Sequence, residues 1–444
     1  MGHSFIGRIK NEGMARSCDE LASDDKSPPE STIASSYLDM DPFDVYQRDA
    51  RSGWMALGGV GVSILFSIIC ICYGVYLAFY RHTINEVALS PSWRNTPFDS
   101  VSEVFTGVIA ILPTTNSAKT EVLSLTLNLV VTACTESIGF VHSIALKSAL
   151  ASESRLHCNT SLRLLTAARS NRWTNPNGTL FNGIMAVLLI VSYVSSTFIF
   201  IPIHSQVVDG SSQSWWNTCI FAPPVLTLGI ALLLQAIITM MGISRARVLT
   251  WSSSPLDTTA ALLHDGLLIR RSGRCMHNAL DSTLYLGPRP PSECQPSAWE
   301  AHPSIKKIII VLWCLVFGCA VWASIVVIVW VKGITSARGP GLDSWSIFPN
   351  DRTNLVGWET YVDPNRGFLA AAWVIIYILF IVIQGGITVG LHCSEVIANV
   401  VRDEVMWRRA TSEMGTKPTK NPLLMALGSW PNVGLLIAKP VLRK

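Results

Sequence analysis

Six long apolar stretches constrain the fold of this chain more than any other feature of its sequence. A helix needs about 20 apolar residues to cross about 30 Å of hydrocarbon. The stretches that qualify run approximately over residues 54–80, 123–146, 181–203, 219–241, 308–331 and 368–391. Charged residues make up only 14% of the 444 residues, against about 25% in a soluble globular domain. The sequence therefore predicts an all-α, polytopic membrane bundle of six transmembrane helices.

The distribution of basic residues predicts how the chain is threaded. On one side of the membrane, the residues near span ends are Arg48, Arg51, Lys147, Arg155, Arg163, Arg169, Arg172, Arg245, Arg247, Arg289, Lys306, Lys307, Arg402, Arg408 and Arg409. The opposite side has fewer, and the loop over 204–218 has none. Because cytoplasmic loops are enriched in Lys and Arg, both termini are expected in the cytoplasm.

The regions outside the spans suggest three parts. Residues 1–53 are polar and contain Ser and Pro clusters, a composition typical of disorder, so a disordered cytoplasmic tail is expected there. The six-span bundle occupies 54–393 and includes a long cytoplasmic loop over 242–307. Residues 394–444 are expected to form a second cytoplasmic tail that is helical at its start.

One helix is predicted inside the long loop, over "SPLDTTAALLHDGLLIR". Ser254 is placed to cap it, Pro255 suits its first position, and Asp257 favours the positive end of the helix dipole. Its apolar face is expected to lie on the bilayer or against the bundle. The residues of this face are Leu256, Ala260, Leu263 and Leu267.

The second span carries a polar stripe around a carboxylate. Glu136 stands near its middle, Thr132 and Ser143 share its helix face, and His142 flanks them. Placing a carboxylate at the bilayer centre costs about 2.5–3.5 kcal/mol on insertion scales. This face is therefore expected to point into the bundle. His142 lies near the cytoplasmic end, where a side chain can snorkel.

Other spans carry polar or small residues at matching helical spacing. These are Tyr377, Gln384, Thr388 and His392 in the sixth span, Thr227, Ala231, Gln235 and Thr239 in the fourth, and Ser192 and Ser196 in the third. In the first span, Gly59, Ser63 and Ser67 form a ridge of small residues. Such ridges let a neighbouring helix approach closely.

Two interpretations of the polar residues remain open. The first is an intramembrane polar or ion site that binds a cation or relays a proton, with Glu136, Thr132, Ser143, His142, Gln384 and His392 as its candidate residues. The second is interhelical hydrogen bonding, worth on the order of 0.6 kcal/mol for each bond. Intramembrane ionisable groups favour the first interpretation. The lack of a second acidic residue within the predicted spans weakens it.

Four segments carry a resemblance to known sequences: "SWRNTPFDSVSEV", "NLVVTACTESIGFVHS", "LRLLTAARSNRW" and "TWSSSPLDTTAALLH". Together they resemble a group of uncharacterised multi-pass membrane proteins predicted from fungal genomes, over about residues 85–410. The resemblance implies a polytopic fungal membrane protein and carries no known activity. It is interrupted by residues 105–122, with Glu-Val on both sides of the junction. We hypothesise that this segment is a retained intron or a mispredicted exon.

Motifs of soluble enzymes do not occur in the sequence. It contains no G-x-x-x-x-G-K-[ST] loop, no H-E-x-x-H and no G-x-S-x-G, so no enzyme activity, metal site or cofactor is expected. The net charge of +4 is too small to indicate nucleic-acid binding. The leading prediction is a structural or interaction protein of the plasma membrane or an endomembrane, with the bilayer and cytoplasmic proteins as partners. The alternative is a small-solute or ion transporter or channel that uses the face of Glu136. No sequence feature specifies an oligomeric state.

Overall fold

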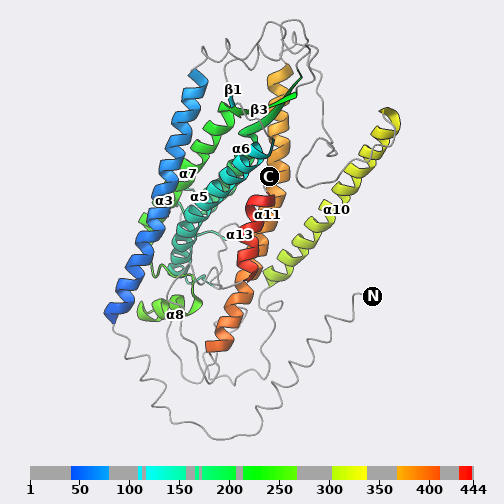
Figure 1. Cartoon of the computed structure of the whole chain (residues 1–444). Helices are drawn as coiled ribbons and strands as arrows, with labels where there is room; N and C mark the ends of the chain where they lie inside the picture. The colour runs from blue at the N-terminus through cyan, green and yellow to red at the C-terminus, as the bar shows by residue number, and fades with distance from the viewer. Residues whose placement is uncertain are drawn as a thin grey trace, which may run out of the picture.

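Six helices of the computed structural model have the length and apolar composition needed to cross a membrane (Figure 1). They are α3 (Pro42–Phe79), α5 (Ser117–Ser152), α6 (Thr179–Phe198), α7 (Ala222–Arg245), α10 (Pro303–Ala337) and α11 (Phe368–Ala410). The structure describes residues 42–79, 109–112, 117–156, 166–169, 173–206, 214–267, 303–337, 368–410 and 430–442. The chain is an integral multi-pass membrane protein, and the predicted all-α bundle of six transmembrane helices is confirmed.

The helix bounds differ from those of the predicted spans, and the differences in the third and sixth spans have structural consequences. The third predicted span, 181–203, overruns α6, which ends at Phe198. Pro202 opposes continuation of the helix to residue 203, because proline lacks an amide hydrogen and disfavours helical geometry at the residue before it. The sixth predicted span ended at residue 391, whereas α11 continues to Ala410. The candidate membrane span within α11 runs over Tyr377–Ala410.

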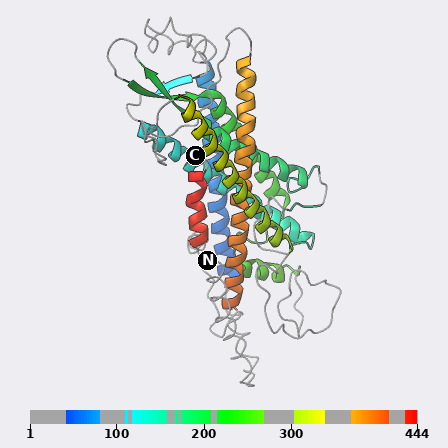
Figure 2. The ribbon, with the colours of Figure 1, turned by 90° about the vertical axis from the view of Figure 1, so that its right-hand side faces the viewer.

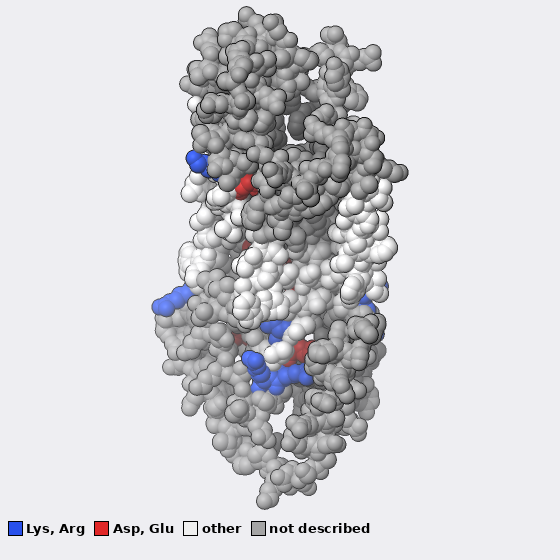
Figure 3. Space-filling view, turned by 45° about the vertical axis from the view of Figure 1, so that its right-hand side comes forward, with Lys and Arg blue, Asp and Glu red and all other residues white. Residues whose placement is uncertain are grey.

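The bundle has two different ends. The first residues of α3 and the last residues of α11 lie at the same end (Figure 1). A short helix, α8 (Pro255–His264), lies there too, where its Thr258 lines a small pocket together with Lys147 and Ser148 near the end of α5. In Figure 3, most of the visible Lys and Arg side chains lie below a band of uncharged residues. The positive-inside rule assigns this end to the cytoplasm.

A three-stranded antiparallel sheet lies at the opposite end of the bundle (Figure 2). Its strands are β1 (Ile109–Leu112), β2 (Phe200–Gln206) and β3 (Ser214–Phe221), in the order β1-β3-β2. Cys219 of β3 is paired with Ile111 on one side and with Ile201 on the other. The sequence analysis did not predict these strands. The segment 105–122, which interrupts the fungal resemblance, supplies β1 and the first residues of α5.

The predicted ridge of small residues in α3 is confirmed as a close helix contact. A Cβ atom at Gly59 would lie 3.0 Å from Ser137 Oγ in α5. Ser63 Oγ donates to the Gly59 carbonyl of its own helix at 2.8 Å and lies 3.4 Å from the Cys134 carbonyl of α5, and Ser67 Oγ donates to the Gly229 carbonyl of α7 at 3.1 Å. α3 therefore packs closely against α5 and α7. Buried apolar residues of α3, α5, α6 and α7 form the main hydrophobic core.

α10 lies at the edge of the bundle. Its Ile308 packs against Cys393 and Val396 of α11, while large apolar side chains along its length, such as Trp313 and Phe317, are exposed. This distribution is the one expected of a helix whose outer face contacts lipid.

The helix predicted inside the long loop is present as α8, with one difference at its start. Ser254 stands at the N-cap position but makes no side-chain cap hydrogen bond. Its Oγ donates instead to Met406 Sδ of α11 at 3.6 Å. Leu263 and Leu267 are exposed, so this part of the apolar face does not pack on the bundle.

The C-terminal region, residues 394–444, is helical at its start as predicted, because α11 extends to Ala410. The sequence analysis did not predict a further helix, α13 (Trp430–Leu442), which packs against α11 and α5. Figure 2 shows α13 lying alongside the bundle. The predicted disordered tail falls mostly on residues 1–41, and most of the long loop on 268–302, both outside the described residues.

Candidate intramembrane charge cluster

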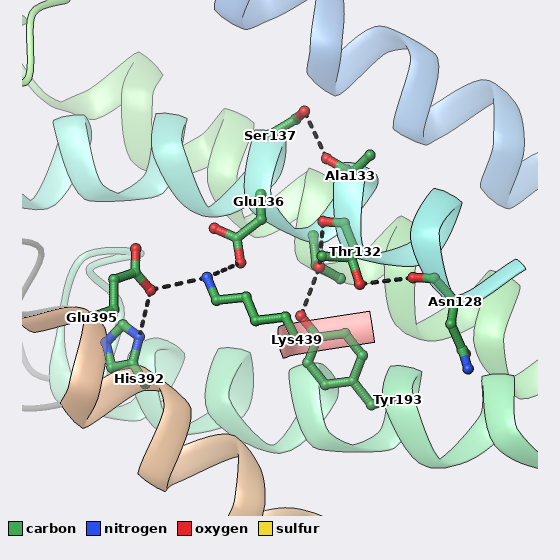
Figure 4. Close-up of polar contacts among 10 residues, drawn as sticks. Asn128, Thr132, Ala133, Glu136, Ser137, Tyr193, His392, Glu395 and Lys439 are labelled. Atoms are coloured by element: carbon green, nitrogen blue, oxygen red, sulfur yellow. Dashed lines mark hydrogen bonds and ion pairs between the residues drawn. The ribbon is translucent and has the colours of Figure 1, made fainter. Parts of the chain in front are cut away.

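Four ionisable side chains from three helices meet at an edge of the bundle (Figure 4). Lys439 Nζ of α13 donates hydrogen bonds to Glu136 Oε1 of α5 at 2.6 Å and to Glu395 Oε2 of α11 at 3.2 Å. His392 Nδ1 lies 3.6 Å from the same oxygen of Glu395. These four residues, Glu136, His392, Glu395 and Lys439, are here named the charge cluster.

Local sequence explains how each helix contributes to the charge cluster. His392 and Glu395 stand three residues apart and therefore share one face of α11. Glu136 is central in α5, on the polar stripe that sequence analysis placed toward the bundle. α13 has 13 residues and is therefore about 20 Å long, too short to cross a bilayer. Lys439 lies in its last turn, so α13 brings the ammonium to the depth of Glu136.

Charge pairing compensates for burial within the cluster. Lys439 is only 6% exposed, and an unpaired ammonium at such a position is strongly disfavoured. Two carboxylates and one ammonium carry a formal charge of −1. The Glu136 and Glu395 side chains keep 29% and 22% of their surface exposed, so the carboxylates stand at an edge of the bundle.

A second polar layer lies beside the charge cluster. The Thr135 hydroxyl and the Tyr193 hydroxyl are hydrogen-bonded at 2.7 Å, and Tyr193 is fully buried. Figure 4 places the Tyr193 ring beside the Lys439 side chain. Thr132 lies on the same stripe of α5 but donates to the carbonyl of Asn128, in its own helix, at 2.7 Å.

Thr135 also lines a small cavity of about 20 Å³ between α5, α6 and α7. A water molecule needs about 10–15 Å³, so the cavity has room for roughly one. His142 lines it and shares a 2.7 Å hydrogen bond between its Nε2 and Asn182 Oδ1. Gln235 lines it too, and its Nε2 donates to Ser192 Oγ at 2.8 Å. The expectation that His142 snorkels is wrong, because its side chain is 1% exposed.

The structure brings together part of the predicted ion site. Glu136 and His392 meet through Lys439 and Glu395. Thr132 and His142 make the hydrogen bonds described above with other groups. Ser143 and Gln384 are buried, and within the described residues neither is hydrogen-bonded to the charge cluster. The predicted six-residue set is thus divided between the cluster and its surroundings.

Two residues of the charge cluster, Glu395 and Lys439, were not among the predicted site residues. Glu395 follows His392 by three positions but lies beyond the predicted end of the sixth span at residue 391. The candidate span of the structure runs over Tyr377–Ala410 and therefore includes Glu395. Lys439 is a lone basic residue within the apolar run "VGLLIAKPVL". That pattern is its only signal in the sequence.

The described residues hold no group of three or more His, Cys, Asp or Glu side chains arranged for a metal ion. Comparison with models of protein families, with curated proteins and with solved structures finds no match to this chain.

Proposed function

We propose that this membrane protein is a transporter of small cations, and that the carboxylates of Glu136 and Glu395 form its binding site. The observation that carries the proposal is the position of Lys439 Nζ, at 2.6 Å and 3.2 Å from these two carboxylates. A positive charge is thus already stabilised between two transmembrane helices. Ionisable residues inside a membrane span are expensive and commonly mark the paths of ions or substrates.

The arrangement suits a cation for electrostatic reasons. A cation that leaves water needs fixed negative charge to replace its hydration. Glu136 and Glu395 supply that charge from α5 and α11, so a shift of either helix changes the distance between the carboxylates. Binding and release could then follow from relative motion of the two helices.

Flux into proteoliposomes tests this proposal. The purified protein is reconstituted and cation uptake is followed for wild type, Glu136→Gln and Glu395→Gln. The matched control is Glu404→Gln, which changes a carboxylate of the same helix that pairs with Arg408 at 2.6 Å outside the cluster. We expect flux near the protein-free baseline in the two cluster variants and near wild type in the control. Equal flux in Glu136→Gln and wild type would overturn the proposal.

A structural or interaction role is the second candidate. It is favoured by a specific observation: Lys439 bridges both carboxylates, which fastens α13 to α5 and α11 without any external ligand. Under this reading α13 completes the bundle, and the protein acts through its cytoplasmic segments. The resemblance to uncharacterised fungal multi-pass proteins fits either role and adds no activity. Wild-type protein without flux for any cation, together with loss of folded protein in Glu136→Gln, would favour this candidate.

A further inference from the structure

We infer that the cytoplasmic end of the bundle contains a binding site for one chloride ion, formed by Lys147 and Ser148 of α5 and by Ser252 just before α8. This site is separate from the charge cluster and does not depend on the proposed transport function. Three observations carry the inference: a small cavity, a lysine without a close partner of opposite charge, and hydroxyl groups that line the same cavity.

The cavity lies where α5 meets the segment that leads into α8, at the end of the bundle where Figure 1 shows α8. Its volume is about 10 Å³, and a site needs about 10–15 Å³ to hold one water molecule. Its polar lining residues are Lys147, Ser148, Thr250, Ser252 and Thr258. No acidic side chain of the described residues lines it, and the other lining side chains are aliphatic. A cavity of this size and lining favours one small anion over a cation or a polyatomic ion.

Lys147 supplies the positive charge of the site. Its side chain is partly buried, and within the described residues its ammonium makes neither a hydrogen bond nor an ion pair. The charged groups that act on it are Asp403 and Arg402 of α11, and these two are paired with each other at 3.2 Å. Two cations and one carboxylate leave a net positive charge here. Because an ammonium that leaves water without a partner is costly, an anion beside Lys147 stabilises this arrangement.

Two hydroxyl groups complete the set of donors. Ser148 is only 6% exposed, and its Oγ makes no hydrogen bond within the part of the chain that the structure describes. Ser252 Oγ accepts a hydrogen bond from the Ser254 amide at 3.0 Å, which leaves its own O–H as a donor. A chloride ion accepts hydrogen bonds from any direction because its charge is spherical. It can therefore be shared by donors from two segments of the chain.

A bound anion at this position connects three helices. It joins the end of α5 to the segment before α8, and Ser254 of that segment donates to Met406 Sδ of α11 at 3.6 Å. A ligand that binds the folded protein and not the unfolded chain stabilises the folded state by an amount that grows with its concentration. Chloride is therefore expected to stabilise this protein in a saturable way.

Thermal unfolding of the full-length protein in detergent tests the inference. Chloride replaces gluconate at constant ionic strength over a millimolar range. We expect the midpoint of unfolding to rise with chloride and then to reach a plateau, as binding to one site requires. A midpoint that does not change with chloride would overturn the inference. Saturable stabilisation by millimolar phosphate instead of chloride would also overturn it, and would assign the site to phosphate or to a phosphorylated lipid headgroup.

Three variants show whether chloride acts at this cavity. Lys147→Gln removes the charge and is expected to abolish the rise in the midpoint. Lys307→Gln changes an exposed lysine at the start of α10 and is expected to keep the wild-type response. Ser148→Ala should raise the chloride concentration for half-maximal stabilisation about tenfold, because one hydrogen bond to a charged group is lost.

An equal chloride response in Lys147→Gln and wild type would overturn the inference. If Lys147→Gln does not fold, Ser148→Ala decides the question, since it removes only one oxygen atom from the site. An unchanged half-maximal chloride concentration in Ser148→Ala would then place the anion elsewhere and contradict the assignment.

Discussion

Lys439 Nζ lies 2.6 Å from Glu136 Oε1, although 303 positions separate the two residues in the sequence. This ion pair joins the C-terminal helix α13 to the second membrane span. Glu395 completes the bridge from α11. Three helices that are far apart in sequence are therefore connected by one ammonium group, and this connection is the basis of the predictions below.

The first prediction concerns the strength of this connection. Removing one partner of a fully buried ion pair costs about 3–5 kcal/mol, and the cost here is expected to be lower because 29% of the Glu136 side chain is exposed. Lys439→Met and Glu136→Gln should each lower the free energy of unfolding in detergent. The double variant should cost less than the sum of the two single variants. A coupling energy near zero would show that the pair does not stabilise the bundle.

The second prediction concerns the contact between α3 and α7. A Cβ atom at Gly229 would lie 2.7 Å from Ile71 Cγ1 and 2.9 Å from the backbone oxygen of Ser67. Gly229→Ala should therefore force the helices apart and destabilise the protein by about 1–3 kcal/mol, as overpacking does. At Gly61 an added Cβ would meet nothing within 4 Å, so Gly61→Ala is the matched control. Equal unfolding midpoints for the two variants would contradict the predicted contact.

The third prediction concerns threading. Leu267, just after α8, and Phe79, at the end of α3, are both exposed and lie toward opposite ends of the bundle. In a cysteine-free background, Phe79→Cys should react with a membrane-impermeant thiol reagent in intact cells. Leu267→Cys should react only after permeabilisation. The opposite pattern would mean that the positive-inside rule gives the wrong orientation here.

The fourth prediction concerns residues 105–122. If this segment is a retained intron, sequencing of transcripts across the junction should find a message in which Val104 is followed directly by Leu123. The encoded protein would lack β1 and the first six residues of α5, Ser117–Val122. Presence of the segment in every transcript would reject the hypothesis. In that case β1 is a constant part of the outer sheet.

Sequence alone was sufficient for features that depend on local pattern. Apolar length predicted six spans, and the spacing of Gly59, Ser63 and Ser67 predicted a close helix contact, because both signals lie within one helix. The polar stripe around Glu136 was likewise visible from helical periodicity, and its inward direction followed from the cost of a carboxylate in lipid.

Features that depend on pairing between distant segments were not accessible in the same way. The sheet joins β1 to a hairpin more than 80 residues later, and its short strands occur in loops where periodicity is weak. The partner of Glu136 lies in a helix near the C-terminus that is too short to be read as a span. Hydropathy ended the sixth span at residue 391, because it measures average polarity, whereas Glu395 is accommodated in α11 by its pairing with Lys439.

The most direct test of the central claim is uptake of methylammonium into proteoliposomes, compared among wild type, Lys439→Ala and the Glu136→Gln, Lys439→Ala double variant. If Lys439 occupies a cation site between Glu136 and Glu395, its removal should increase uptake at low methylammonium concentration. The double variant should then return to the protein-free baseline. Identical uptake in all three proteins would show that the charge cluster is not a path for cations, and would leave the structural role of α13 as its explanation.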